Sequence, residues 1–273
     1  MILDADNARR RRRMMHPLRR RAEMQRRRFR RGVYLLPSLF TLANLFCGYA
    51  CVVYSMRREF ETAAPFIGLA IILDMLDGRI ARMTGTTSAF GLEFDSLADV
   101  VSFGMAPAIL TFSWGLEPLG RLGWAAGFVF VTGAATRLAR FNIQATTDKR
   151  YFVGMPSPAA AAVPAATVYA YPVGLHDYPS ALPALALMLI PAFLMVSTIR
   201  FRSFKTIDLQ ARRSYKLLVP LAALLFAFLT HPRWALIVIA YGYLLSAFIG
   251  MAITRFRRRG GRAGAEVSDA PSS

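Results

Sequence analysis

The stretch LDMLDGRIARMTGTTSAFGLEFDSLADVVSFG, residues 73–104, places four aspartates inside or beside long apolar runs. They are Asp74, Asp77, Asp95 and Asp99. A carboxylate in the centre of a membrane-spanning helix costs roughly 2.5–3.5 kcal/mol on insertion scales. The first two are three residues apart and the last two are four apart, so each pair projects from one face of its helix. The stretch predicts two helices whose acidic faces need a compensating partner.

The composition of the chain combines strong hydrophobicity with strong positive charge. Its 273 residues are 55% hydrophobic and carry a formal net charge of +18. The charge is segregated from the apolar runs, with thirteen arginines between Arg9 and Arg31. A nucleic-acid-binding domain would interleave its cations with polar and aromatic residues on a folded surface, so nucleic acid is an improbable partner. The pattern is typical of a polytopic membrane protein with basic flanks.

Eight segments are apolar and long enough to be candidate spans, since a spanning helix needs roughly 20 mainly apolar residues. They lie near 34–56, 65–83, 94–115, 121–143, 156–173, 181–199, 215–230 and 234–254. We therefore expect an all-α transmembrane helix bundle over residues 33–255. A basic disordered tail of residues 1–32 precedes it, and a flexible tail of residues 256–273 follows it.

The distribution of Lys and Arg predicts the orientation of the bundle. With the N-terminus inside, the arginine-rich tail, the segment RFRSFKTIDLQARR and the final RFRRRGGR all lie in the cytoplasm. Cytoplasmic loops carry the excess of Lys and Arg, so both termini are expected there, in a multi-pass protein of the cell (inner) membrane. This topology puts both aspartate pairs at the cytoplasmic ends of adjacent antiparallel helices. The two pairs can then converge on one site.

Carboxylates gathered in this way favour a hard divalent cation. No Cys or His accompanies them in residues 73–104, and oxygen ligands suit Mg²⁺ or Mn²⁺ rather than zinc. Ion pairing with Arg79 and Arg82 is an alternative, but it leaves a surplus of acid. A proton or cation pathway, as in an ion transporter, is another. Gly78 and Gly91 add positions without a side chain where a phosphate or nucleotide could approach the backbone.

The fixed positions between Asp74 and Asp99, D-x2-D-G-x2-A-R-x8-G-x3-D-x3-D, resemble the complete signature of the CDP-alcohol phosphotransferase family. Within that family the flanks resemble the CDP-diacylglycerol–serine O-phosphatidyltransferase branch. The matching stretches are LPSLFTLANLFCGYACV (36–52), DSLADVVSFGMAPA (95–108), RLARFN (137–142), GMPSPAAAA (154–162) and LMVSTIRFRSFK (194–205). They run from the first predicted span to the sixth.

The resemblance implies a core of six transmembrane helices, to which this chain adds two, and a site open to the cytoplasm. It implies transfer of the phosphatidyl group of CDP-diacylglycerol to L-serine with release of CMP, by a homodimer among membrane lipids. The metal ligands implied are Asp74, Asp77, Asp95 and Asp99, with Asp99 also the general base. The residues implied to bind the CDP-lipid are Gly78, Ala81, Arg82, Gly91 and Asn44.

The acceptor pocket is less sharply indicated. Arg137 and Arg140 share a face near the end of the fourth predicted span, Asn142 follows, and Ser102 lies one turn beyond Asp99. An arginine fork suits a carboxylate or a phosphate, although both arginines could equally be interfacial anchors. Ser102 and Asn44 are read equally well as helix-packing hydrogen-bond partners. The metal signature alone leaves glycerol 3-phosphate or inositol phosphate open as acceptors, whereas the stretches SFGMAPA and RLARFN favour serine.

Overall fold

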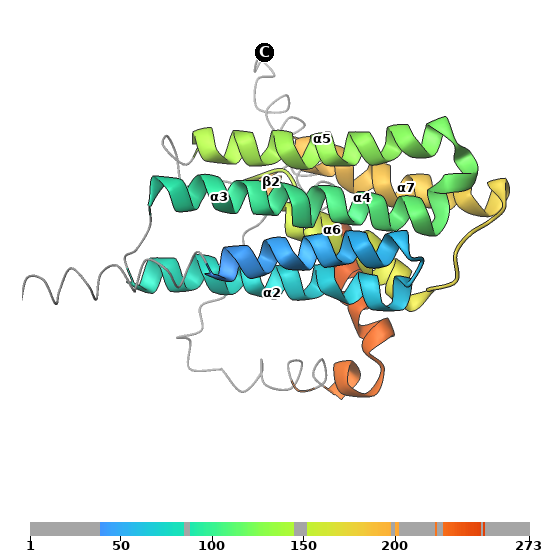
Figure 1. Cartoon of the computed structure of the whole chain (residues 1–273), viewed down its shortest axis with the longest axis horizontal. Helices are drawn as coiled ribbons and strands as arrows, with labels where there is room; N and C mark the ends of the chain where they lie inside the picture. The colour runs from blue at the N-terminus through green and yellow to red at the C-terminus, as the bar shows by residue number, and fades with distance from the viewer. Residues whose placement is uncertain are drawn as a thin grey trace, which may run out of the picture.

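The computed structural model describes residues 39–84, 88–144, 152–197, 200–201, 222, 226–246 and 248. The predicted tails, residues 1–32 and 256–273, lie outside the described residues, as does most of the predicted span at 215–230. In the described part of the chain the fold is a helical bundle, as the long apolar runs predict (Figure 1). The first helix, Leu39–Met56, forms a hairpin with α2, Phe60–Thr84. Arg58, at φ 60°, makes the reversal between them.

A continuous helical run follows, from Ala89 to Leu119. It begins as α3, Ala89–Asp99, whose first turn is capped by the Ser88 hydroxyl accepting from the backbone N–H of Gly91 at 2.9 Å. Two π-helical segments interrupt the α-helix, and such insertions occur often at functional sites. The remaining segments of the run are η1 (Val100–Met105), α4 (Ala106–Thr111), η2 (Phe112–Leu116) and the 3₁₀ turn η3 (Glu117–Leu119). The first π-helical segment begins directly after Asp99.

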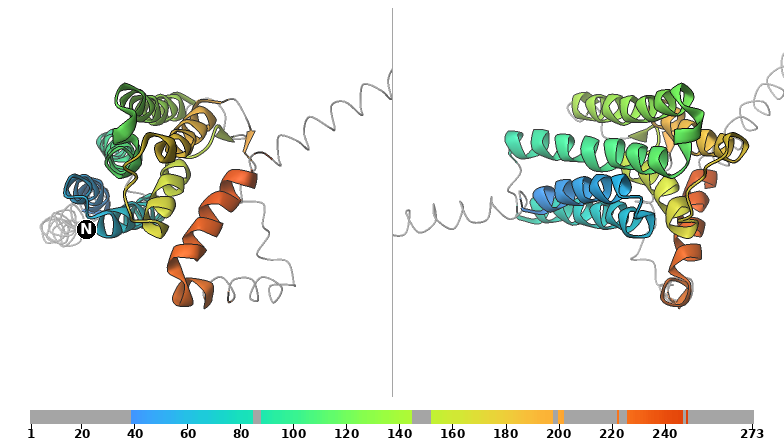
Figure 2. Two further views of the ribbon diagram at one scale, coloured as in Figure 1. Left: turned by 90° about the vertical axis from the view of Figure 1, so that its right-hand side faces the viewer. Right: turned by 45° about the vertical axis from the view of Figure 1, so that its right-hand side comes forward.

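The other helices complete the bundle. They are α5 (Arg121–Gln144), α6 (Ser157–Ala170) and α7 (Tyr178–Val196). Two further helices cover residues 226–230 and 232–246 and cross the bundle axis rather than following it (Figure 2). α6 packs against α2, α4 and α7. Its buried face is rich in alanine, and small side chains let helix backbones approach closely.

A short antiparallel strand pair, which the sequence analysis did not predict, ties the start of α6 to the end of α7. β1, Phe152–Val153, pairs with β2, Arg200–Phe201. Gly154 follows β1 at φ +88°, and a Cβ there would lie 2.4 Å from the carbonyl oxygen of Met195. The close approach therefore needs glycine at this position.

Among the residues that the structure describes, four helical segments are long and apolar enough to cross a membrane: Leu39–Met56, Ala89–Leu119, Arg121–Ile143 and Tyr178–Val196. α2 has comparable length, 25 residues, but carries Asp74 and Asp77. α6 has 14 residues, so at 1.5 Å per residue it is about 21 Å long, shorter than a hydrocarbon core of about 30 Å. The membrane character of the chain follows from these helices, whereas the count of eight spans stays a prediction.

The contact between the first helix and η1 predicts which glycine is indispensable. A Cβ on Gly48 would lie 2.8 Å from Ser102 Cα, whereas nothing lies within 4 Å of one on Gly68 of α2. Overpacking of this kind costs about 1–3 kcal/mol. Gly48→Ala should lower the thermal midpoint of the purified protein in detergent, and Gly68→Ala should leave it unchanged or higher because alanine favours helix. Equal midpoints for the two variants would contradict the packing described here.

Candidate metal centre

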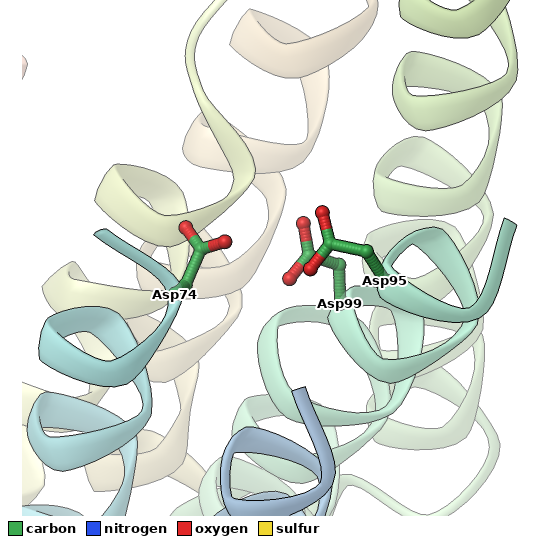
Figure 3. Close-up of side chains that lie close together, drawn as sticks. All are labelled: Asp74, Asp95 and Asp99. Atoms are coloured by element: carbon green, nitrogen blue, oxygen red, sulfur yellow. The ribbon is translucent and has the colours of Figure 1, made fainter. Parts of the chain in front are cut away.

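The side chain of Asp74 on α2 points toward those of Asp95 and Asp99 on α3 (Figure 3). One carboxylate oxygen of each residue lies within 4.8 Å of the others. Asp99 is buried, and Asp74 and Asp95 are half-buried. The spacing of Asp95 and Asp99 keeps both on the face of α3 that looks toward Asp74. The structure thus brings three of the four predicted ligands together.

Asp77 is placed differently from the other three aspartates. It is buried, and the hydroxyl of Thr41 in the first helix donates a hydrogen bond to its Oδ2. It lies outside the group formed by Asp74, Asp95 and Asp99, although its charge still acts on Asp74 and Asp95. The predicted convergence of two aspartate pairs is therefore a cluster of three with a fourth carboxylate beside it.

Several oxygen atoms near the cluster are buried without a hydrogen-bond partner among the described residues. They are Oδ1 of Asn44, Oδ1 of Asp77 and Oδ1 of Asp95. Each is an acceptor, and a buried acceptor without a donor is costly unless a cation meets it. Carboxylate and amide oxygens are the ligands of hard divalent cations. The donor set therefore fits Mg²⁺ or Mn²⁺, as the sequence predicts, and does not by itself choose between them.

The first helix supplies a second contact to the aspartates. The amide Nδ2 of Asn44, a fully buried residue, donates to Asp99 Oδ1 at 3.2 Å. The hydroxyl of Ser102 donates to the backbone carbonyl oxygen of Asn44 at 2.9 Å. Ser102 thus makes the helix-packing bond that the sequence analysis held open. The sequence did not predict a role for Thr41 at the site. The available signal was its position as a second polar residue, three positions before Asn44, in an apolar helix.

The residues predicted for the acceptor pocket have separate partners. Arg137 Nη1 donates to the Ser157 hydroxyl at 2.8 Å, and its charge acts on Asp99 and Asp74. Arg140 Nη1 donates to the carbonyl oxygen of Val196 at 3.1 Å, at the end of α7. Asn142 Nδ2 donates to the Ser96 hydroxyl at 2.9 Å. Of these three residues, Arg137 is the one whose charge acts on the carboxylates.

Of the five positions predicted to bind the CDP-lipid, Asn44 lies in the first helix, and the other four lie on α2 and α3. A Cβ at Gly78 would find only Arg82 Nη2, at 3.8 Å, so the space beside α2 is open there. Arg82 is exposed and its charge acts on Asp74, and Ala81 is half-buried. Gly91 lies in the first turn of α3, where a Cβ would be 3.0 Å from the capping Ser88 hydroxyl. The lipid-binding role of these residues stays a prediction.

Comparison of the sequence with known proteins identifies relatives of this chain. A family model described as CDP-alcohol phosphatidyltransferase matches residues 34–196. The chain is 38% identical over 223 residues to a protein named CDP-diacylglycerol–serine O-phosphatidyltransferase from Helicobacter pylori (strain J99), covering 80% of this chain and 91% of that protein. A Bacillus subtilis (strain 168) protein of the same name is 32% identical over 171 residues, 62% of this chain and 91% of that one.

An archaeal protein is similar as well. It is named archaetidylserine synthase, from Methanothermobacter thermautotrophicus, and is 35% identical over 168 residues, 61% of this chain and 69% of that protein. The region matched by the family model runs from before the first helix to the end of α7. It therefore includes the whole carboxylate cluster and both residues of the first helix that contact the aspartates.

The geometry predicts that divalent cations stabilise the folded protein through Asp95. A ligand that binds only the folded state at 100 times its Kd stabilises that state by about 2.7 kcal/mol. Adding MnCl₂ should raise the thermal midpoint of the purified protein in detergent, and Asp95→Asn should remove most of that rise. Glu93→Gln, on an exposed position of α3, is the matched control and should keep it. An undiminished rise in Asp95→Asn would show that the cation binds elsewhere.

Proposed function

The chain belongs to the CDP-alcohol phosphatidyltransferase family, and from this premise we propose that it transfers the phosphatidyl group of CDP-diacylglycerol to the hydroxyl of L-serine, releasing CMP. The observation that carries the proposal is the convergence of Asp74, Asp95 and Asp99 between two helices. The names of the relatives from Helicobacter pylori and Bacillus subtilis support CDP-diacylglycerol and serine as the substrates. The reaction serves phospholipid synthesis.

We assign the role of general base to Asp99. A serine hydroxyl is a poor nucleophile until a base within hydrogen-bond reach takes its proton. The serine oxygen then bonds to the phosphorus of the phosphatidyl group, the phosphorus–oxygen bond to CMP breaks, and the proton passes to the Asp99 carboxylate. Asn44 holds Oδ1 of that carboxylate, which leaves Oδ2 to face the substrate. No covalent intermediate with the enzyme is required.

Charge at the reacting phosphate has to be neutralised, because phosphoryl transfer is catalysed mainly by positioning and electrostatics. Asp74, Asp95 and Asp99 would hold the divalent cation, and we propose Asp77 as a further ligand through its Oδ1, which is buried without a hydrogen-bond partner among the described residues. When bound, Mg²⁺ or Mn²⁺ supplies a Lewis acid that polarises the phosphate and stabilises the leaving CMP. We propose that Gly78, Ala81, Arg82 and Gly91 leave room for the cytidine and pyrophosphate of the donor.

Arg137 is our candidate for the serine carboxylate. Its charge acts on the cluster from α5, and its guanidinium is anchored by Ser157 at 2.8 Å. Arginine binds carboxylates in a planar, bidentate geometry that lysine cannot reproduce. Arg140 and Asn142, which bond to Val196 and Ser96, are assigned supporting positions at the same end of α5. Phosphorylated alcohols such as glycerol 3-phosphate are the alternative acceptors, because an arginine also suits a phosphate.

We propose that the site faces the cytoplasm of the cell (inner) membrane. Thr41 and Asn44 lie near the start of the first helix, directly after the arginine-rich segment, and both contact aspartates of the cluster region. The arginine-rich segment precedes the first helix in the sequence, and an excess of arginine favours the cytoplasmic side for the start of that helix. Both termini in the cytoplasm, eight spans and a homodimer complete the proposal.

The proposal predicts an acceptor-specific release of CMP. The purified protein in detergent, given CDP-diacylglycerol and Mn²⁺ or Mg²⁺, should release CMP with L-serine and not with glycerol 3-phosphate or inositol phosphate. Asp99→Asn should reduce the rate about 10²- to 10⁴-fold, the usual contribution of general acid–base catalysis. Glu93→Gln serves as the control. CMP release with glycerol 3-phosphate and not with serine would contradict the assignment of serine as the acceptor. Full activity of Asp99→Asn would show that Asp99 is not the general base.

A further inference from the structure

We propose that the first helix, Leu39–Met56, forms a third wall of the carboxylate site, in which Thr41 and Asn44 are positioning residues for Asp77 and Asp99. The inference rests on the proposed function for its catalytic meaning. Its structural basis is independent of the acceptor, because it concerns how the aspartates are held rather than which alcohol reacts.

Two hydrogen bonds from one helix face carry the proposal. Thr41 and Asn44 are three residues apart, so both side chains project in the same direction. The Thr41 hydroxyl donates to Asp77 on α2, and Asn44 Nδ2 donates to Asp99 on α3 at 3.2 Å. Thr41 is 3% exposed and Asn44 is fully buried. One turn of the first helix thus holds one carboxylate from each of the two acidic helices.

The bonds select which carboxylate oxygen remains for a ligand. A hydrogen bond to an ionised acceptor is stronger than one between neutral groups, so it fixes the rotamer of the carboxylate. Thr41 occupies Oδ2 of Asp77 and leaves Oδ1, which is buried and has no hydrogen-bond partner among the described residues. Asn44 occupies Oδ1 of Asp99 in the same way. Partners that orient metal-ligating side chains typically change metal affinity 10- to 100-fold when mutated.

The position of the first helix is fixed by contacts with η1 close to Thr41 and Asn44. The Ser102 hydroxyl bonds to the carbonyl oxygen of Asn44 at 2.9 Å, and Gly48, one turn further, lies so close to η1 that a Cβ would be 2.6 Å from Ser102 Oγ. Sliding or rotating the helix would break this contact. The two donors are therefore presented from a fixed backbone.

The experiment measures Mn²⁺ affinity directly. The full chain is purified in detergent, and the Kd for Mn²⁺ is obtained by titration with electron paramagnetic resonance, which counts free ion without any substrate. Thr41→Val keeps the shape of the side chain and removes the donor, and Asn44→Leu does the same for the amide. Each should weaken Mn²⁺ binding about 10- to 100-fold. Thr41→Ser restores a hydroxyl and should bring the Kd back close to that of the unaltered chain.

The matched control is Ser55→Ala, which removes a buried hydroxyl from the same helix. Ser55 Oγ donates to the carbonyl oxygen of Cys51 in its own helix at 2.6 Å, and within the described ranges no hydrogen bond joins it to an aspartate. This variant should leave the Kd unchanged whatever it does to the thermal midpoint. The proposal is overturned if Thr41→Val binds Mn²⁺ as Ser55→Ala does, or if Thr41→Ser fails to restore binding in a folded protein.

The outcome separates this inference from the proposed function. If the unaltered chain releases no CMP with L-serine, the acceptor assignment fails while the Mn²⁺ titration still decides the role of Thr41. If Thr41→Val does not fold, Asn44→Leu and the Thr41→Ser comparison decide it, and a normal Kd in Asn44→Leu counts against the proposal. In an active protein, Thr41→Val should raise the Mn²⁺ concentration needed for half-maximal rate while changing the KM for CDP-diacylglycerol little.

Discussion

The mutual repulsion of carboxylates held near one another in a helical bundle is the constraint on which the rest of the structure depends. Asp74, Asp95 and Asp99 converge within a few ångströms, in surroundings where charges interact more strongly than in water. Such a cluster is tolerable only when donors and cations face it. The first helix supplies donors to Asp77 and Asp99, and α5 brings the charge of Arg137. The arrangement of these helices follows from what the aspartates require.

Small residues make that arrangement possible. Gly48 lets the first helix lie against η1 so closely that Ser102 reaches the backbone of Asn44. Gly154, in a backbone conformation that favours glycine, lets the strand before α6 meet the end of α7. Both positions hold backbone segments together near the functional end of the bundle. The residues that bring chemistry to the site therefore depend on neighbours that have no side chain.

Much of this structure was readable from the sequence, because helix formation and acidic spacing are local properties. The length of the apolar runs predicted the helices from Leu39 to Val196, and the spacing of Asp95 and Asp99 predicted their common face. Pairing between distant segments was not readable. Nothing local couples Thr41 to Asp77, or Arg140 to the carbonyl oxygen of Val196, 56 residues away. The crossing direction of the helix at 232–246 and the pairing of β1 with β2 depend on the assembled bundle in the same way.

The alanine-rich buried face of α6 affects how precisely the helices around it are positioned. Alanine has no side-chain rotamers to lose on burial, so packing against it costs no side-chain entropy and allows no rearrangement. Ala160, Ala161, Ala165 and Ala166 are buried in α6, which packs against α2, α4 and α7, and none of them has χ angles to change. Between helices in a bilayer, van der Waals packing replaces the hydrophobic effect as the source of cohesion. The helix that anchors Arg137 through Ser157 thus packs through alanines that take no part in the chemistry themselves.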